Sequence, residues 1–114
     1  MTPVAEQHMA ALASANRIRL ERAEIKRGLA AKPSRHDAFG ALAELIDGGE
    51  VEPVPVDELL QACRDSGRLT MLRVLRAAGI GSELKRVREL TERQRDSLVS
   101  VLRANTTPRG ALHG

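Results

Sequence analysis

The residues of this chain whose types and spacing could do chemistry lie in and beside a glycine-bearing turn. The segment Arg64-Asp65-Ser66-Gly67-Arg68 has the composition of a turn between two apolar helical segments. Glycine lets a backbone approach an anion, and the first N–H groups of the helix after it can bind phosphate. Arg64 and Arg68 flank the turn with charge, and Ser66 and Thr70 add hydroxyl donors. The turn predicts a phosphate site, although it is equally typical of an ordinary antiparallel helix hairpin.

A second basic group follows about twenty residues later in the sequence, at Lys85-Arg86-Val87-Arg88. Val87 is its one apolar member and could anchor the loop to a core while its neighbours face solvent. Arginines held in this way can contact successive phosphates or enter a minor groove. A solvated surface loop is the alternative interpretation. We expect this loop and the turn to converge on a single face.

The N-terminal segment supplies a third basic group. Its members could lie across a DNA backbone as secondary contacts, or they could form a solvated helix face; they are Arg17, Arg19, Arg22, Lys26 and Arg27.

Charge is segregated along the chain, which has a net charge of +3. Positions 37–63 hold seven acidic residues and no Lys or Arg, whereas basic residues dominate on both sides. Fifteen of the 18 basic residues are arginine, the side chain that can bind phosphate bidentately. This distribution favours a polyanion partner over a merely solvated surface. Membrane binding is disfavoured because the basic helix lacks bulky apolar anchors.

Catalytic groupings are absent from the sequence. The three histidines, His8, His36 and His113, are far apart, and no His/Cys cluster has metal-ligand spacing. We therefore expect no enzyme activity, no cofactor, no metal and no small-molecule substrate. The lone Cys63 follows Leu59-Leu60-Gln61-Ala62, which favours burial in a helix over a reactive thiol. A cytoplasmic location is expected, because a lone cysteine does not indicate an oxidising compartment.

These residues must be positioned by helices, because the apolar residues are mostly aliphatic and Phe39 is the only aromatic one. We expect an all-α fold in which a long N-terminal helix packs on a small domain, with 1–34 as the helix, 35–104 as the domain and 105–114 as a disordered tail. The apolar stripe expected on the long helix comprises Leu12, Ala15, Ile18, Ile25 and Leu29, and the N-terminal part of this helix should project from the globule. The helices are expected at Ala5–Ala31, Arg35–Ile46, Asp57–Arg64 with Asp57 as N-cap, Arg68–Ala78, and from Thr91 to a point before Thr107.

Burial inside the later helices can also be predicted. The fourth helix should bury Leu69, Leu72, Val74 or Leu75, and Ala78, and the last helix should bury Leu98, Val101 and Leu102. Thr91 and Gln94 should form a capping box at the start of the last helix.

With the turn and the loop placed, the chain resembles the actinobacterial-type integration host factor family over about 15–102. The resemblance rests on the order of five short motifs. They are Arg22-Ala23-Glu24-Ile25-Lys26, Val56 with Leu59-Leu60-Gln61-Ala62, Gly67-Arg68, Arg86-Val87-Arg88 with Leu90, and Glu92-Arg93-Gln94-Arg95 with Leu98. Departures from the family pattern at Cys63-Arg64, at Ser66 and at Glu89-Leu90-Thr91 mark a divergent member.

The resemblance implies a helix-two-turns-helix domain that binds duplex DNA with little sequence preference and acts as an architectural, nucleoid-associated protein. Gly67 and Arg68 would then form the phosphate-binding turn, and Lys85, Arg86 and Arg88 the groove- or backbone-contacting loop. Two alternatives stay open: an RNA-binding helix-two-turns-helix protein, and an interaction module or decoy that acts on a host DNA-binding protein. A monomer is expected, with a protein partner as the alternative.

Overall fold

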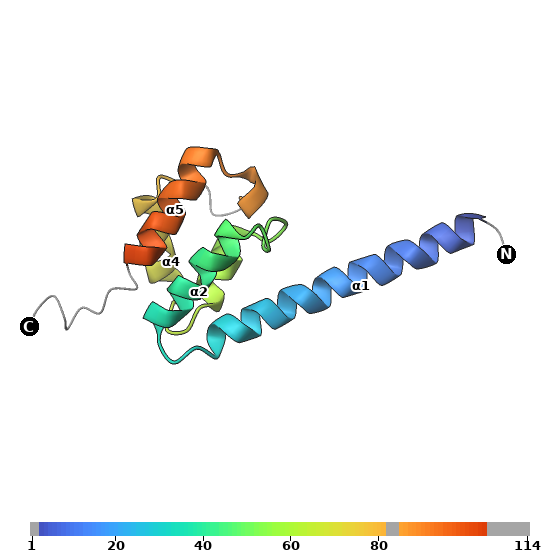
Figure 1. The fold of residues 1–114 in the computed structure, drawn as a ribbon, viewed down its shortest axis with the longest axis horizontal. Helices are drawn as coiled ribbons and strands as arrows, with labels where there is room; N and C mark the ends of the chain where they lie inside the picture. Colours follow the sequence, from blue (N-terminus) through green and yellow to red (C-terminus); the bar gives the residue numbers. More distant parts are fainter. Residues whose placement is uncertain (1–2, 82–84, 105–114) are drawn as a thin grey trace, which may run out of the picture.

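The computed structural model describes residues 3–81 and 85–104, and this part of the chain is all-helical, as expected. A long helix is followed by a compact group of shorter ones (Figure 1). The elements are α1 (Pro3–Ala30), α2 (Arg35–Asp47), α3 (Val56–Ala62), α4 (Arg68–Ala77), the 3-10 turn η1 (Val87–Glu89) and α5 (Glu92–Ala104).

Helix α1 packs on the globule only near its C-terminal end. Leu29 is buried and Ile25 is half-buried, and both contact the core. Leu12 and Ile18, from the same expected stripe, are about half exposed (49% and 50%), because the N-terminal part of the helix extends away from the other helices (Figure 1). The projection of this part is therefore confirmed, whereas the stripe is buried only in its last two turns.

The core lies between α2, α4 and α5. Helix α2 packs mainly on α5, and α4 packs on the same helix. Phe39 in α2 is fully buried, as are Met71 in α4 and Leu98 in α5. Ser34 precedes α2 and accepts a hydrogen bond from the backbone N–H of Asp37, which fixes where the helix begins.

Two predictions for the third and fourth helices are wrong. Helix α3 begins at Val56, and its N-cap position is occupied by Pro55 rather than by Asp57, because the fixed φ of proline suits the extended residue before a helix. In α4, Leu69 is 63% exposed instead of buried. The buried face of α4 is formed by Met71, Val74 and Leu75, whose spacing turns Leu69 toward solvent.

The start of α5 is as predicted. The backbone N–H of Thr91 donates to Gln94 Oε1, and the backbone N–H of Gln94 donates to Thr91 Oγ1. Leu98 and Leu102 are buried, whereas Val101 is only half-buried and Val99 is buried instead. The buried face of the last helix is therefore rotated slightly from the predicted one.

Within 3–81 and 85–104, none of the helices combines the length and the apolar character needed to cross a bilayer. The tail expected at 105–114 lies outside the described residues.

Candidate nucleic-acid interface

The turn between α3 and α4 owes its tight shape to Asp65 and not to Gly67. Asp65 is the one non-glycine residue with positive φ (57°) in the described part of the chain. Asp tolerates this left-handed conformation better than most residues, because its short side chain can hydrogen-bond locally. Gly67, the N-cap residue of α4, has a φ of −89° and a ψ of −172°, which any residue can adopt. The backbone conformation at position 67 therefore does not require a glycine.

Gly67 does leave an open surface at the start of α4. A side chain built at this glycine would meet nothing within 4 Å, so no neighbour in the described fold requires the glycine for space. No side chain caps the α4 N-terminus. An incoming anion would therefore find room beside the positive end of the helix dipole.

The side chains predicted around this turn differ in accessibility. Arg64 and Arg68 are exposed, while Thr70 is half-buried and accepts a hydrogen bond from Arg35 Nη1 at 3.4 Å. Ser66 is only 7% exposed, and its hydroxyl is buried without a hydrogen-bond partner in the described structure. The two arginines are thus the groups that can meet a ligand directly, and Ser66 lies beneath the surface.

Asp65 places a negative charge inside this basic turn. Its carboxylate lies 3.9 Å from Arg64 Nε, and Arg64 Nη1 also donates to the carbonyl of Lys32 at 3.4 Å. Both side chains are well exposed, so solvent screens this contact and it leaves Arg64 able to bind another anion.

Helix α4 carries two further exposed arginines that the sequence analysis did not assign to the site, Arg73 and Arg76. The helix contains no Asp or Glu, so Arg68, Arg73 and Arg76 share one element without an internal counter-charge. The sequence could have predicted a basic face here, because Arg73 and Arg76 are three positions apart and therefore lie on one side of the helix.

The basic loop is anchored as predicted, since Val87 is fully buried. The loop is also tied to the segment before α3, where Pro55 and Arg86 form an isolated antiparallel bridge. The backbone N–H of Val87 donates to the Val54 carbonyl at 3.0 Å, and that of Arg88 donates to the Glu52 carbonyl at 2.9 Å. Residues 82–84, just before the anchored part, lie outside the described structure.

Only one of the three loop cations extends freely into solvent. Lys85 and Arg86 are half-buried: Lys85 Nζ donates to Gln94 Oε1 at 3.4 Å, and Arg86 Nη1 donates to the Pro53 carbonyl. Arg88 is exposed. Its position is fixed by the backbone bond to Glu52, so the loop presents a single well-placed arginine.

A paired arginine and glutamate hold this loop against α5. Nη1 and Nη2 of Arg95 donate to the carboxylate of Glu52, at 2.5 and 2.7 Å, and Arg95 also donates to the carbonyls of Ile46 and Val87. The hydrogen bonds from Arg95 lower the pKa of Glu52 below its usual value of 4.5, and the same contact raises the pKa of Arg95. The bidentate pair therefore links α5, the end of α2 and the basic loop.

The cations of α1 fall into two groups. Arg22 and Lys26 lie over α3 and share the carboxylate of Glu58, with Arg22 Nε at 2.5 Å and Lys26 Nζ at 3.7 Å. The hydrogen bond from Arg22 is the main reason that the pKa of Glu58 is lowered. The remaining three, Arg17, Arg19 and Arg27, are exposed. Because Glu58 offsets part of their charge, Arg22 and Lys26 are weaker candidates for DNA contact than these three exposed arginines.

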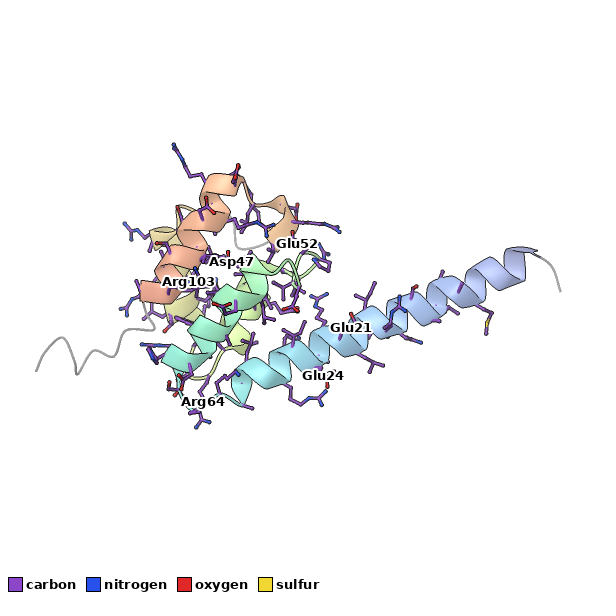
Figure 2. The ribbon with its side chains drawn as sticks, viewed as in Figure 1. Glu21, Glu24, Asp47, Glu52, Arg64 and Arg103 are labelled. Atoms are coloured by element: carbon purple, nitrogen blue, oxygen red, sulfur yellow. The ribbon has the colours of Figure 1, made fainter. Side chains whose placement is uncertain are left out.

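The turn and the basic loop lie at opposite ends of α3, and the expectation that they converge on a single face stays a prediction. The loop contacts residues 52–56, at the start of α3, whereas the turn follows its last residue. A helix of seven residues is about 10 Å long. In Figure 2, Arg64 lies beside the end of α1, and Glu52, the loop's partner, lies near the opposite end of α2.

The acidic stretch at 37–63 pairs largely with the chain's own arginines. Besides the Glu52 and Glu58 pairs, Arg103 Nη2 lies 2.5 Å from Asp47 and 3.3 Å from Glu44 (Figure 2). The paired carboxylates of the acidic stretch therefore link helices to one another, in addition to adding negative charge to the surface. Cys63, at the end of the stretch, is buried, and burial raises the pKa of its thiol to about 12.

Comparisons with protein-family models, with curated proteins and with solved structures gave no match.

Proposed function

We propose that this protein binds duplex DNA through its phosphates, with little sequence preference, and that the start of α4 is the main contact. The observation that carries the proposal is the open, uncapped N-terminus of α4 at Gly67, with exposed Arg64 and Arg68 beside it. Backbone N–H groups and arginines are the donors that hold phosphates in protein–DNA interfaces. Such contacts fix position on the duplex and do not read the bases.

The basic loop would supply a second contact on the same duplex. Arg88 lies near one end of α3 and the turn follows the other, and the two ends of this helix are about 10 Å apart. This separation is comparable to the width of the major groove, about 12 Å. Each contact can then reach a different strand, an arrangement that suits an architectural, nucleoid-associated role of the integration-host-factor kind.

Duplex DNA is favoured over single strands because the chain exposes no aromatic side chain of Phe, Tyr or Trp. Single-strand binding proteins stack bases on exposed aromatic side chains. Phe39 is the only aromatic residue of the chain, and it is fully buried in the core. The chain therefore has no exposed Phe, Tyr or Trp on which a base could stack, whereas it has exposed arginines that can contact phosphates.

The competing partner functions have weaker support. A decoy that binds a host protein through an acidic surface would have only part of the stretch at 37–63 for this purpose, because Glu44, Asp47, Glu52 and Glu58 pair with arginines of the same chain. Duplex RNA offers phosphates too, and the choice between the two duplexes is a matter for direct competition.

The experiment is a fluorescence-anisotropy titration of the full chain with two unrelated DNA duplexes of equal length, followed by competition with a duplex RNA of the same length. We expect similar affinities for the two DNA sequences and weaker binding of the RNA. No binding to either DNA duplex, or displacement by RNA at equal or lower concentration, would contradict the proposal.

A further inference from the structure

Helix α1 has a second apolar stripe that faces away from the globule. Met9 and Leu20 are the most exposed large apolar side chains of the described structure, at 66% and 70%. Figure 1 shows α1 extending alone from the other helices. In proteins, most of the stability of a helix comes from the packing of an apolar face rather than from intrinsic propensity.

The spacing of the stripe is that of a coiled-coil seam. Exposed residues follow one another at alternating intervals of four and three, in the order Met9, Ala13, Asn16, Leu20 and Ala23. These are a and d positions of a heptad in which Ala13 and Leu20 occupy a. Ile25 and Leu29, which pack on the core, lie on the opposite side of the helix because they are offset by about half a turn. The same helix can therefore bind the globule with one face and a partner helix with the other.

The charges beside the seam indicate which partner fits. Arg19 falls at a g position and Glu24 at the e position five residues later, which are the two positions that meet across a parallel, two-stranded coiled coil. Both side chains are exposed, and neither takes part in an ion pair within 3–81 and 85–104. In a parallel pair of identical helices, each Arg19 would face the Glu24 of the other copy. In an antiparallel pair, g positions face g positions and e positions face e positions, so Arg19 and Glu24 do not meet.

We propose that α1 binds the α1 of a second copy of this chain as a parallel, in-register coiled coil along the seam from Met9 to Ala23. Asn16, at a d position, would meet its own counterpart, and this polar pair would weaken the seam. The two globules lie on the outer faces of the pair, because they pack on the side of α1 opposite the seam. A dimer replaces the monomer expected from the sequence. The proposal is independent of DNA binding and is tested without DNA.

Sedimentation equilibrium of the full chain over a wide concentration range gives the first test. We expect a reversible monomer–dimer equilibrium, weak because the seam spans only about two heptads. Leu20→Glu places two like charges across the seam and should weaken dimerisation at least tenfold. Leu69→Glu is the matched control, since Leu69 is a similarly exposed leucine on α4, and it should leave the equilibrium unchanged. A chain that stays monomeric at all concentrations, or an equal effect of the two variants, overturns the proposal.

Cysteine cross-linking tests the orientation. Ala13→Cys and Ala23→Cys lie ten positions apart, so both can form a disulfide with their own counterpart only in a parallel, in-register pair. Wild type is the control for Cys63, which is buried and should stay reduced under the same oxidant. Glu21→Cys, exposed but off the seam, should not cross-link. Cross-linking of only one of the two seam variants would show an antiparallel pair and overturn the assigned geometry.

Charge exchange tests the assigned ion pair. Arg19→Glu and Glu24→Arg each place like charges across the seam and should weaken the dimer several-fold. The double variant restores opposite charges and should recover the wild-type equilibrium. Failure of the double variant to recover, with each single variant still impaired and correctly folded by circular dichroism, contradicts the parallel register.

Discussion

Gly67 gives the sharpest test of the turn at the scale of one residue. Its φ is negative and its Cβ position is open, so Gly67→Ala should change the free energy of unfolding by less than about 1 kcal/mol. The new methyl group would occupy the space that we assign to a phosphate. We expect a loss of about 1 kcal/mol in binding free energy, roughly fivefold in affinity for duplex DNA. Thermal unfolding and anisotropy titration of the same sample separate the two effects.

Asp65 offers a change in the opposite direction. Asn accepts a left-handed conformation at least as well as Asp, so Asp65→Asn should preserve the turn. The substitution removes a negative charge 3.9 Å from Arg64. We expect the affinity for DNA to rise about two- to fivefold, since an exposed charge contributes up to about 1 kcal/mol. Weaker binding by a folded Asp65→Asn protein would argue that Asp65 shapes the site instead of opposing it.

At the scale of the element, the Arg95–Glu52 pair gives a prediction on pH. The folded-state pKa of Glu52 is lowered, so the stabilisation is complete above its ordinary pKa of 4.5 and is lost as the pH falls through the lowered value. We expect the melting temperature of the wild type to drop between about pH 5 and about pH 3. Glu52→Gln should start lower at neutral pH and show a smaller drop. Equal drops in the melting temperature of both proteins would assign the acid sensitivity to other groups. Glu58, whose pKa is also lowered, would be the first of these to test, with Glu58→Gln.

The helices were predictable at this scale where local chemistry decides them. The capping pair Thr91 and Gln94 and the anchor Val87 could be identified in the sequence, because each depends on neighbours within a few positions or on a single apolar residue among charges. Leu69 could not, since its orientation depends on which of several apolar faces α4 turns toward α5. The pairing of Arg95 with Glu52 joins residues 43 positions apart and leaves no local signal.

At the scale of the whole molecule, the alternation of basic and acidic segments in the sequence does not become two separate faces. Arg22 and Lys26 of α1 form ion pairs with Glu58 of α3, and Arg95 of α5 forms one with Glu52, to which the basic loop is hydrogen-bonded. The exposed arginines of α4, a helix that itself contains no Asp or Glu, remain candidates for contact with an anion. Composition showed that arginines are abundant, but only the packing determines which of them meet solvent.

The dimer proposed for α1 has a consequence at this largest scale. Two globules on opposite sides of one coiled coil would hold two turns on a single assembly, so binding to a long duplex should exceed binding to a short one by more than the number of sites. Leu20→Glu should remove this advantage and leave the affinity for a short duplex unchanged. We would measure both affinities for the wild type and the variant at equal protein concentration.

The salt dependence of DNA affinity tests the phosphate account most directly. For the wild type, the logarithm of the association constant should fall linearly with the logarithm of salt concentration, by about 0.9 per phosphate neutralised. The double variant Arg64→Ala/Arg68→Ala should bind more weakly with a slope shallower by about 1.8, whereas Arg103→Gln, which removes a charge already paired with Asp47, should keep the wild-type slope. A wild-type affinity that does not respond to salt, or a double variant with an unchanged slope, would contradict the assignment of the α4 turn.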